Sequence, residues 1–173
     1  MASVLKVDKI TLPNDTEILN PTTGTLNDVN GYSMLKGDCV VLGPNTSTTY
    51  AAGSTVTNWQ VHQQHGTSLT ASSSGVTVNK AGSYFIMASL LCNTGTSGST
   101  GDGRIRVNSS NIVATYAHAA DTGNWEKSVG ACAVYCNAGD FIDYYNQDAN
   151  HIWGTTNPNS YTHAPFTIIR IGD

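Results

Sequence analysis

The fold is decided by residues 75–91, which read GVTVNKAGSYFIMASLL. A short apolar run at Val76–Val78 is followed by Asn79–Gly82, where Asn and Gly accept the positive φ of a tight turn at little cost. The apolar run that comes next, Tyr84–Leu91, is bounded again by turn formers. The stretch therefore predicts two β-strands joined by a turn.

The same succession of short apolar runs and turn-forming residues recurs along the whole chain. No window of 11 or more residues has apolar residues at helical spacing, whereas short apolar runs return every 8 to 15 residues between Gly, Asn, Asp, Ser and Thr. That spacing is typical of an antiparallel sandwich or barrel. The expected strands are Val4–Leu12, Asp38–Leu42, Asn58–Gln63, Val76–Val78, Tyr84–Asn93, Gly103–Val107, Ile112–His118, Lys127–Asn137, Phe141–Gln147 and Phe166–Ile171. We expect exposed loops at 71–75 and 93–103, which are rich in Ser, Thr and Gly.

Two of these strands are apolar on both faces, although a strand of a two-layer sandwich normally alternates. Either a loop or the N-terminal segment covers the outer face, or the face packs on identical subunits around a symmetry axis. The second reading is favoured because monomers rarely leave contiguous apolar patches in water. The residues expected in the core or the subunit interface are Tyr84, Phe85, Ile86, Met87, Leu91, Val134 and Tyr135.

Charge is scarce in this chain. Ser, Thr, Asn and Gly supply 71 of 173 residues, while Lys and Arg supply 8 and Asp and Glu 12. Nucleic-acid binding needs clustered basic residues, and so does attraction to an anionic membrane surface, so we expect neither partner. The apolar runs are concentrated enough to build a core, and one main domain is the default at this length.

Residues 1–37 differ from the remainder. They carry two prolines and a small apolar set, Val4, Leu5, Val7, Ile10 and Leu12. Such a segment cannot form a core of its own, so it is either a mobile tail or an arm that docks on another chain; we assign 1–37 as an anchoring arm and 38–173 as the sandwich domain. Lys6, Asp8 and Lys9 interrupt any signal-peptide core, and no apolar stretch reaches membrane-spanning length, so we expect no membrane insertion.

The four cysteines are too few and too scattered for a disulfide framework. If Cys132 and Cys136 share a strand they are separated by about 13 Å, beyond the roughly 7 Å limit for a bridge. We expect all four, Cys39, Cys92, Cys132 and Cys136, to be free and mostly buried. A cross-strand disulfide and a metal site remain as alternatives.

The chemistry-bearing residues form no recognisable catalytic motif. His62 and His65 fall on opposite faces of a strand, while His118, His151 and His163 are isolated in sequence. Glu17 and Glu126 are the only glutamates. Asp140, Asp143 and Asp148 cluster in sequence, and carboxylates suit calcium, but their spacing fits no EF-hand loop. We therefore expect no catalytic residue, no cofactor and no metal site.

Loops 93–102 and 149–161 are the candidate binding loops. The second contains His151, Trp153 and Tyr161, and exposed aromatics among Asn and Thr suit contact with a sugar or a protein. The alternative is that Trp153 folds back over the end of the domain. Trp59 and Trp125 are expected to pack in or against the core.

From residue 58 onward the order of signals resembles the C1q/tumour-necrosis-factor-like jelly roll, a ten-stranded sandwich that assembles as a compact trimer. Residues 75–86 look like that family's Gly-x-Tyr-x-Phe strand, with Ile86 in place of the second aromatic. The segments 104–108, 137–142 and 162–171 match its later strands and turns, but His163 and Pro165 stand where Phe and Gly are usual. The resemblance implies an all-β, antiparallel, homotrimeric jelly roll. Trimers of this kind can hold calcium on or near their axis, although we expect the aspartates here to be solvated turn carboxylates.

The opening residues 1–8, MASVLKVD, are similar to the start of structural proteins of tailed phages. With no signal peptide expected, this resemblance implies a virion surface protein made in the host cytoplasm. We expect a non-enzymatic homotrimeric head decoration or cement protein, held by its arm to capsid or tail proteins of the same particle. The alternative is a tail-fibre or spike module that recognises a host surface glycan or protein.

Overall fold

The computed structural model describes residues 38–45, 48–93, 100–118, 126–147, 151–154 and 165–172, together with three short strands among the first 37 residues. Side chains are described for 38–45, 48–93, 101–116, 126–147 and 165–172. The chain divides into two compact units, Met1–Gly37 and Asp38–Asp173. Among the described residues, no helix is long and apolar enough to cross a membrane.

The first unit contains a small antiparallel sheet. Its strands are β1 (Ile10–Thr11), β2 (Glu17–Asn20) and β3 (Thr25–Leu26), in the order β1-β2-β3. Of the expected strand Val4–Leu12, Ile10 and Thr11 form β1, and its other residues lie outside the described residues. Of the predicted arm residues, Ile10 lies in β1, and Val4, Leu5, Val7 and Leu12 lie outside the described residues.

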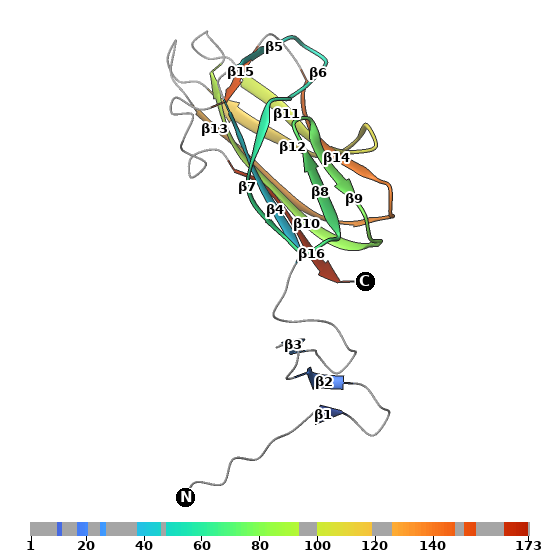
Figure 1. Cartoon of the computed structure of the whole chain (residues 1–173). Coiled ribbons are helices and arrows are strands. Elements are labelled where there is room, and N and C mark those ends of the chain that lie inside the picture. Colours follow the sequence, from blue (N-terminus) through green and yellow to red (C-terminus); the bar gives the residue numbers. More distant parts are fainter. Residues whose placement is uncertain are drawn as a thin grey trace, which may run out of the picture. The chain divides into compact units, whose positions relative to one another are not determined.

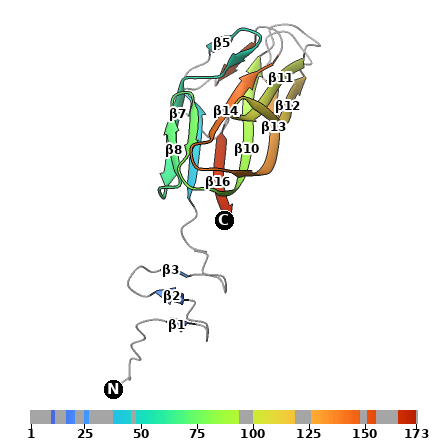
Figure 2. The same cartoon turned by 90° about the vertical axis from the view of Figure 1, so that its right-hand side faces the viewer.

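The second unit is an antiparallel sandwich of two layers (Figures 1 and 2). The first layer has the strand order β7-β4-β16-β10-β13 and the second β12-β11-β14-β9-β8. The bounds of the first layer are β7 Trp59–His65, β4 Cys39–Pro44, β16 Phe166–Gly172, β10 Gly82–Asn93 and β13 Glu126–Cys136. Those of the second are β12 Ser110–His118, β11 Thr100–Val107, β14 Phe141–Asn146, β9 Gly75–Val78 and β8 Leu69–Ser72.

The core lies between the two layers and is built from alternating side chains of both. Phe166 of the first layer lies with its ring 6.2 Å from that of Tyr144 of the second and 5.4 Å from that of Trp59. The fully buried large side chains are Tyr84, Tyr144, Phe166, Leu42, Leu69, Ile86, Leu90, Ile105, Ile142, Ile168 and Val40. Trp59 is in the core as expected, and Trp125 lies outside the described residues.

A polar cluster is built into this core where the layers meet. The hydroxyls of Tyr144 and Thr115 are hydrogen-bonded, and Ser128 donates to Thr115 Oγ1 at 2.8 Å. Gly103 faces this cluster, and a Cβ there would overlap the Tyr144 hydroxyl oxygen. Burial raises the pKa of Tyr144 well above its usual value, so the phenol stays protonated.

Residues 48–58 form a segment that the sequence did not predict, and we call it the strap. Its strands β5 (Thr48–Tyr50) and β6 (Ser54–Thr55) pair with β15 (His151–Gly154) and with β14, respectively. Because β15 also pairs with β10, the strap connects the two layers at one end of the sandwich (Figure 1). Fully buried Asn146 holds it by donating from Nδ2 to Tyr50 O and Ala51 O at 3.0 and 2.9 Å.

The structure corrects both loop predictions. Residues 71–75 were expected to be an exposed loop, but β8 and β9 form a hairpin in which only Ser73–Ser74 turn and Gly75 is buried. Residues 100–102, expected in the loop 93–103, belong to β11, and Asp102 is buried. Cross-strand pairing orders these Ser-, Thr- and Gly-rich residues, which carry little apolar signal of their own.

Candidate self-association surface

Strand β10 occupies the middle of the first layer, hydrogen-bonded to β13 on one side and to β16 on the other. Its burial alternates along its full length. Tyr84 and Ile86 point into the core and are fully buried, whereas Phe85, Met87 and Leu91 are half-buried on the outer face. The apolar outer side chains therefore lie on the side of the layer that the sandwich core does not use.

Strand β13 shows the same pattern with more exposure. Cys136 is buried, and Cys132 and Val134 pack against the core. On the opposite face Val129 is 54% exposed and Tyr135 58% exposed. Ala131 and Ala133 lie between them and are exposed too.

The neighbouring strands extend this surface in both directions. Ile169 of β16 lies opposite Phe85, and Ile171 is 58% exposed near the end of the same strand. Tyr116 of β12 lies opposite Val129 and is 57% exposed, and Ile112 of the same strand is 38% exposed. We call the following set the apolar face: Phe85, Met87, Leu91, Ile112, Tyr116, Val129, Ala131, Ala133, Tyr135, Ile169 and Ile171.

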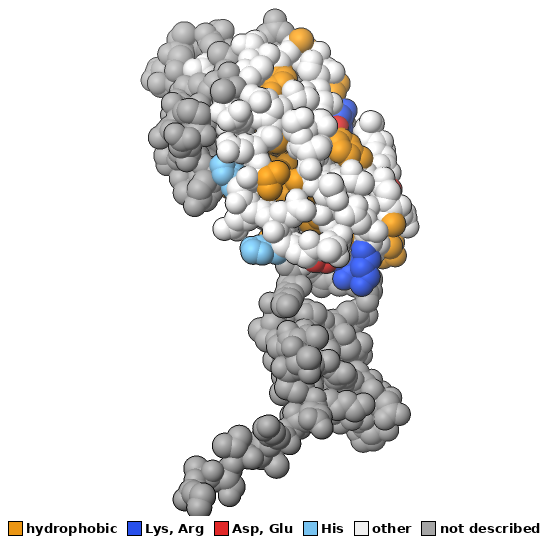
Figure 3. Space-filling model, in the orientation of Figure 1, with side chains coloured by type: hydrophobic (Ala, Val, Ile, Leu, Met, Phe, Trp, Pro, Cys, Tyr) orange, Lys and Arg blue, Asp and Glu red, His pale blue; other side chains and the backbone are white. Residues whose placement is uncertain are grey.

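The apolar face gathers most of the exposed large apolar side chains of the described residues. Of six such side chains, five belong to it, and the sixth is Val61 on β7. Residues 128–136 of β13 include no charged residue, and Lys127 stands at one end of the strand. On the side of the domain seen in Figure 3, by contrast, apolar side chains form small groups separated by other side chains and backbone.

On β11 and β14, the strands of the second layer that follow β12, the outer side carries paired charges instead of exposed apolar side chains. Arg106 donates from Nε to Asp143 Oδ1 at 2.8 Å and from Nη2 to Thr55 Oγ1 at 2.9 Å, and its guanidinium lies 4.0 Å from the ring centroid of Tyr145. Arg104 pairs with Asp102 and lies over the Tyr116 ring at 5.6 Å. These charges are paired within the chain, so this side needs no partner to satisfy them.

The predicted acidic cluster serves the turns of the fold. Asp140 accepts from Asn137 N and from Asn108 Nδ2, both at 2.7 Å, and Asp143 is held by Arg106. Asp148 lies outside the described residues. Among the residues that the structure describes, no three His, Cys, Asp or Glu side chains are placed to hold a metal ion.

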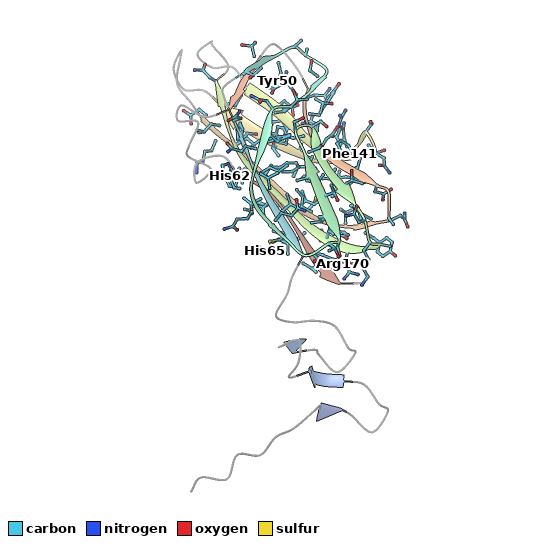
Figure 4. All side chains as sticks on the ribbon, in the orientation of Figure 1. Tyr50, His62, His65, Phe141 and Arg170 are labelled. Carbon is cyan, nitrogen blue, oxygen red and sulfur yellow. The ribbon has the colours of Figure 1, made fainter. Side chains whose placement is uncertain are left out.

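The histidines of β7 lie on the polar edge of the first layer. His62 is half-buried, and burial lowers its pKa, while His65 is exposed and lies opposite Cys39 (Figure 4). For His118 the structure describes only the backbone, and His163 lies outside the described residues.

The predicted ligand loop is partly a strand, which corrects the expectation of an irregular loop at 149–161. His151 lies opposite Tyr50, and Trp153 lies opposite both Cys92 and Thr48, so backbone bonding frames β15 on two sides. Tyr161 lies outside the described residues.

All four cysteines are free. Cys92 and Cys136 are buried, and Cys39 and Cys132 are half-buried. Burial raises the pKa of Cys92 to about 12 and that of Cys136 to about 11, so these thiols stay protonated at neutral pH. They behave as small apolar core residues.

Comparison with known proteins identifies the fold. No protein-family model matches the chain, and no curated protein sequence matches it. Murine APRIL has 16% sequence identity and a TM-score of 0.63, over 79% of this chain and 100% of that chain. Eiger TNF from S. frugiperda has 12% identity and a TM-score of 0.66, over 80% of this chain and 94% of that chain. The expected all-β jelly roll is confirmed: the chain has the TNF-like fold.

Proposed function

We propose that the protein is a non-enzymatic homotrimer in which the apolar face of each copy packs against the other two. The observation that carries this proposal is a set of apolar outer side chains on four neighbouring strands, which are exposed on β12, β13 and β16 and half-buried on β10. Leaving such a patch in water costs about 25 cal/mol for each Å² of apolar surface. Identical subunits remove that cost without any second gene product.

Three copies are proposed because of the fold. The sequence resembles a family whose members assemble as compact trimers, and the fold expected from that resemblance is the one observed. A face that extends over four strands, from β16 to β12, offers different parts for contact with two neighbouring copies, and contacts between unlike parts can close into a ring. One trimer would carry three arms. Once one arm is bound, the other two are held near their sites at a high effective concentration, so that three weak contacts give a stable attachment.

The role that we propose for this trimer is decoration of a virion surface, with residues 1–37 attached to capsid or tail proteins. Support comes from the phage-like opening residues and from the division of the chain at Gly37. Apolar residues of the arm would dock by strand addition or in a groove of the underlying protein.

Localisation in intact particles tests this role. Labelled protein bound evenly over the head supports decoration, and label at the tail tip supports a fibre. A chain lacking residues 1–37 should remain a folded trimer and fail to join particles. If the shortened trimer still incorporates, the arm is not the anchor.

The second candidate function is recognition of a host glycan or protein. The observation that favours it is β15, which places His151 and Trp153 on a strand framed by β5 and β10 at one end of the sandwich. Purified trimer should then label host cells, and Trp153→Ala should abolish the labelling. If the labelling survives the substitution, recognition depends on residues other than Trp153.

A further inference from the structure

Asp38 is the first residue of the sandwich unit, at the point where the N-terminal segment enters it. It stands immediately before β4, which lies between β7 and β16 and is hydrogen-bonded to both. Any pull on residues 1–37 reaches the sandwich through this residue. What holds Asp38 therefore decides how the sandwich responds to tension on the arm.

The side chain of Asp38 holds the turn that follows β7. Its carboxylate accepts a hydrogen bond from Thr67 N at 3.2 Å and another from the hydroxyl of Ser68, which is only 3% exposed. The turn is shaped to admit it: Gly66 has a φ of +73°, and a Cβ there would overlap Asp38 Oδ1. Only glycine fits at this position.

The main chain of Asp38 holds the opposite neighbour. Its carbonyl oxygen accepts from Arg170 N of β16 at 2.9 Å. Arg170 in turn donates from Nη2 to Ala81 O at 3.1 Å, and the hydroxyl of Tyr84 donates to Lys80 O at 2.5 Å. Figure 4 shows Arg170 and His65 at the same end of the domain, with Tyr50 at the other.

The turn after β7 is itself tied to the turn before β10. Asn79 N donates to Ser68 O, and Asn79 Nδ2 donates to Thr67 O, both at 2.8 Å. Four segments thus meet around the first residue of the unit: the start of β4, the turn 66–68, the turn 79–81 and the end of β16. β4 is hydrogen-bonded to a strand on each side, and Asp38 extends this bonding by one residue. Its side chain bonds to the turn after β7, and its carbonyl oxygen bonds to β16.

We propose that this arrangement is a mechanical clamp, which keeps tension on the arm from peeling β4 away from either neighbour. When a strand peels away, its hydrogen bonds to the neighbouring strand break one after another. When Asp38 is fixed, the tension acts along β4 instead, and the hydrogen bonds of β4 to β7 and β16 bear it together. The use of the clamp in attachment rests on the proposed function of residues 1–37. Its effect on unfolding under tension does not.

The test is single-molecule pulling on the full chain, with one handle at the N-terminus and the other at Ser73, an exposed residue of the turn between β8 and β9 near the far end of β4. Asp38→Ala should raise the unfolding rate at constant force by about tenfold, equivalent to about 1.4 kcal/mol for the lost charged hydrogen bonds. Asp38→Asn keeps one acceptor oxygen and should have a smaller effect. Asp140→Ala is the matched control, since Asp140 also accepts two hydrogen bonds at a turn.

A second geometry separates a clamp from a general loss of stability. With handles at Ala52 and Ala138, both exposed, the force bypasses the entry point of the arm. The clamp predicts that Asp38→Ala accelerates unfolding more than Asp140→Ala only when the arm is pulled. Equal acceleration in both geometries, or none in the first, would overturn it. No particle is used, so a failed incorporation assay leaves this result unaffected.

Discussion

Two parts of the outer surface of the sandwich differ in chemistry: the apolar face on β16, β10, β13 and β12, and the charged surface of β11 and β14. On the second layer, Arg106 is held by Asp143 and Thr55 and covered by Tyr145, so its charges are satisfied within one chain. On the first layer, the apolar face leaves Val129 and Tyr135 more than half exposed. The charged surface satisfies its charges within the monomer, whereas the apolar face leaves apolar side chains in water that the proposed trimer would bury. Substitutions on the charged surface should therefore lower the stability of the fold, whereas substitutions on the apolar face should weaken the association of copies.

The largest expected effect is on the charged surface. Asp143→Ala leaves the buried Arg106 charge without its partner, which should lower the free energy of unfolding by about 3–5 kcal/mol. Urea denaturation followed by tryptophan fluorescence measures it. Replacing the pair together, as Arg106→Met with Asp143→Leu, should cost less than the single change. A single variant within about 1 kcal/mol of wild type would remove the contrast between the faces.

The next effect is on the apolar face. Ala133→Asp puts a carboxylate in the middle of the apolar face, where a single chain tolerates it because Ala133 is exposed. Burying that charge between copies should raise the dissociation constant at least about a hundredfold, while the isolated domain stays folded. Sedimentation velocity and circular dichroism measure the two quantities.

Val61→Asp is the matched control for this variant, because among the described side chains Val61 is the exposed large apolar one that lies off the apolar face. It should sediment as wild type does. If both aspartate variants stay assembled, the apolar face is not the interface.

A smaller effect is expected in the polar cluster between the layers. Tyr144→Phe removes the hydroxyl that contacts Thr115 and Ser128, and it should cost about 1–3 kcal/mol by leaving a buried hydroxyl partly unsatisfied. Tyr135→Phe, on the exposed face, should change the stability of the fold by less than about 0.5 kcal/mol. Thermal denaturation of both variants measures the difference. Equal effects would mean that the cluster contributes nothing specific.

The effect that is smallest at neutral pH comes from the core thiols, which are protonated there in both the folded and the unfolded chain and give a pH dependence only in the alkaline range. Folding raises the pKa of Cys136 from 9.0 to about 11 and that of Cys92 to about 12. The unfolded chain therefore loses these protons first, so the stability that they contribute is present below pH 9 and declines as pH rises toward 11–12. Denaturation from pH 8 to 11 should show a shallower decline for Cys92→Ala with Cys136→Ala than for wild type. An unchanged slope would show that other groups carry the dependence.

The alternating strands were the part of the fold that could be predicted from sequence. Residues 84–91 alternate core and outer side chains as expected, and the order of residues in β10 and β13 is enough to show that both strands are apolar on two faces. The hairpin β8–β9 was missed because Leu69–Ser72 contains one large apolar residue, and its order comes from pairing with Gly75–Val78. A local pattern predicts a strand only where the strand carries its own apolar signal.

The remaining features depend on residues far apart in the chain. Arg106 and Asp143 are separated by 37 positions, Asp38 and Ser68 by 30, and Asn146 and Tyr50 by 96. No spacing rule joins such pairs, because the topology of the sandwich brings them together. The apolar face was predicted in part: Phe85, Met87, Leu91 and Tyr135 lie on it, whereas Tyr84 and Ile86 lie in the core. Ile112 and Tyr116 belong to the face because β12 pairs with β13, which no local pattern indicates.

In the proposed trimer the apolar face of each copy is buried between three copies of the chain. Light scattering on the purified full chain at micromolar concentration tests this trimer most directly. The proposed trimer should have three times the mass of the 18.2 kDa chain, and it should keep that mass at high salt because the contact is apolar. A mass of one chain under the same conditions would contradict it.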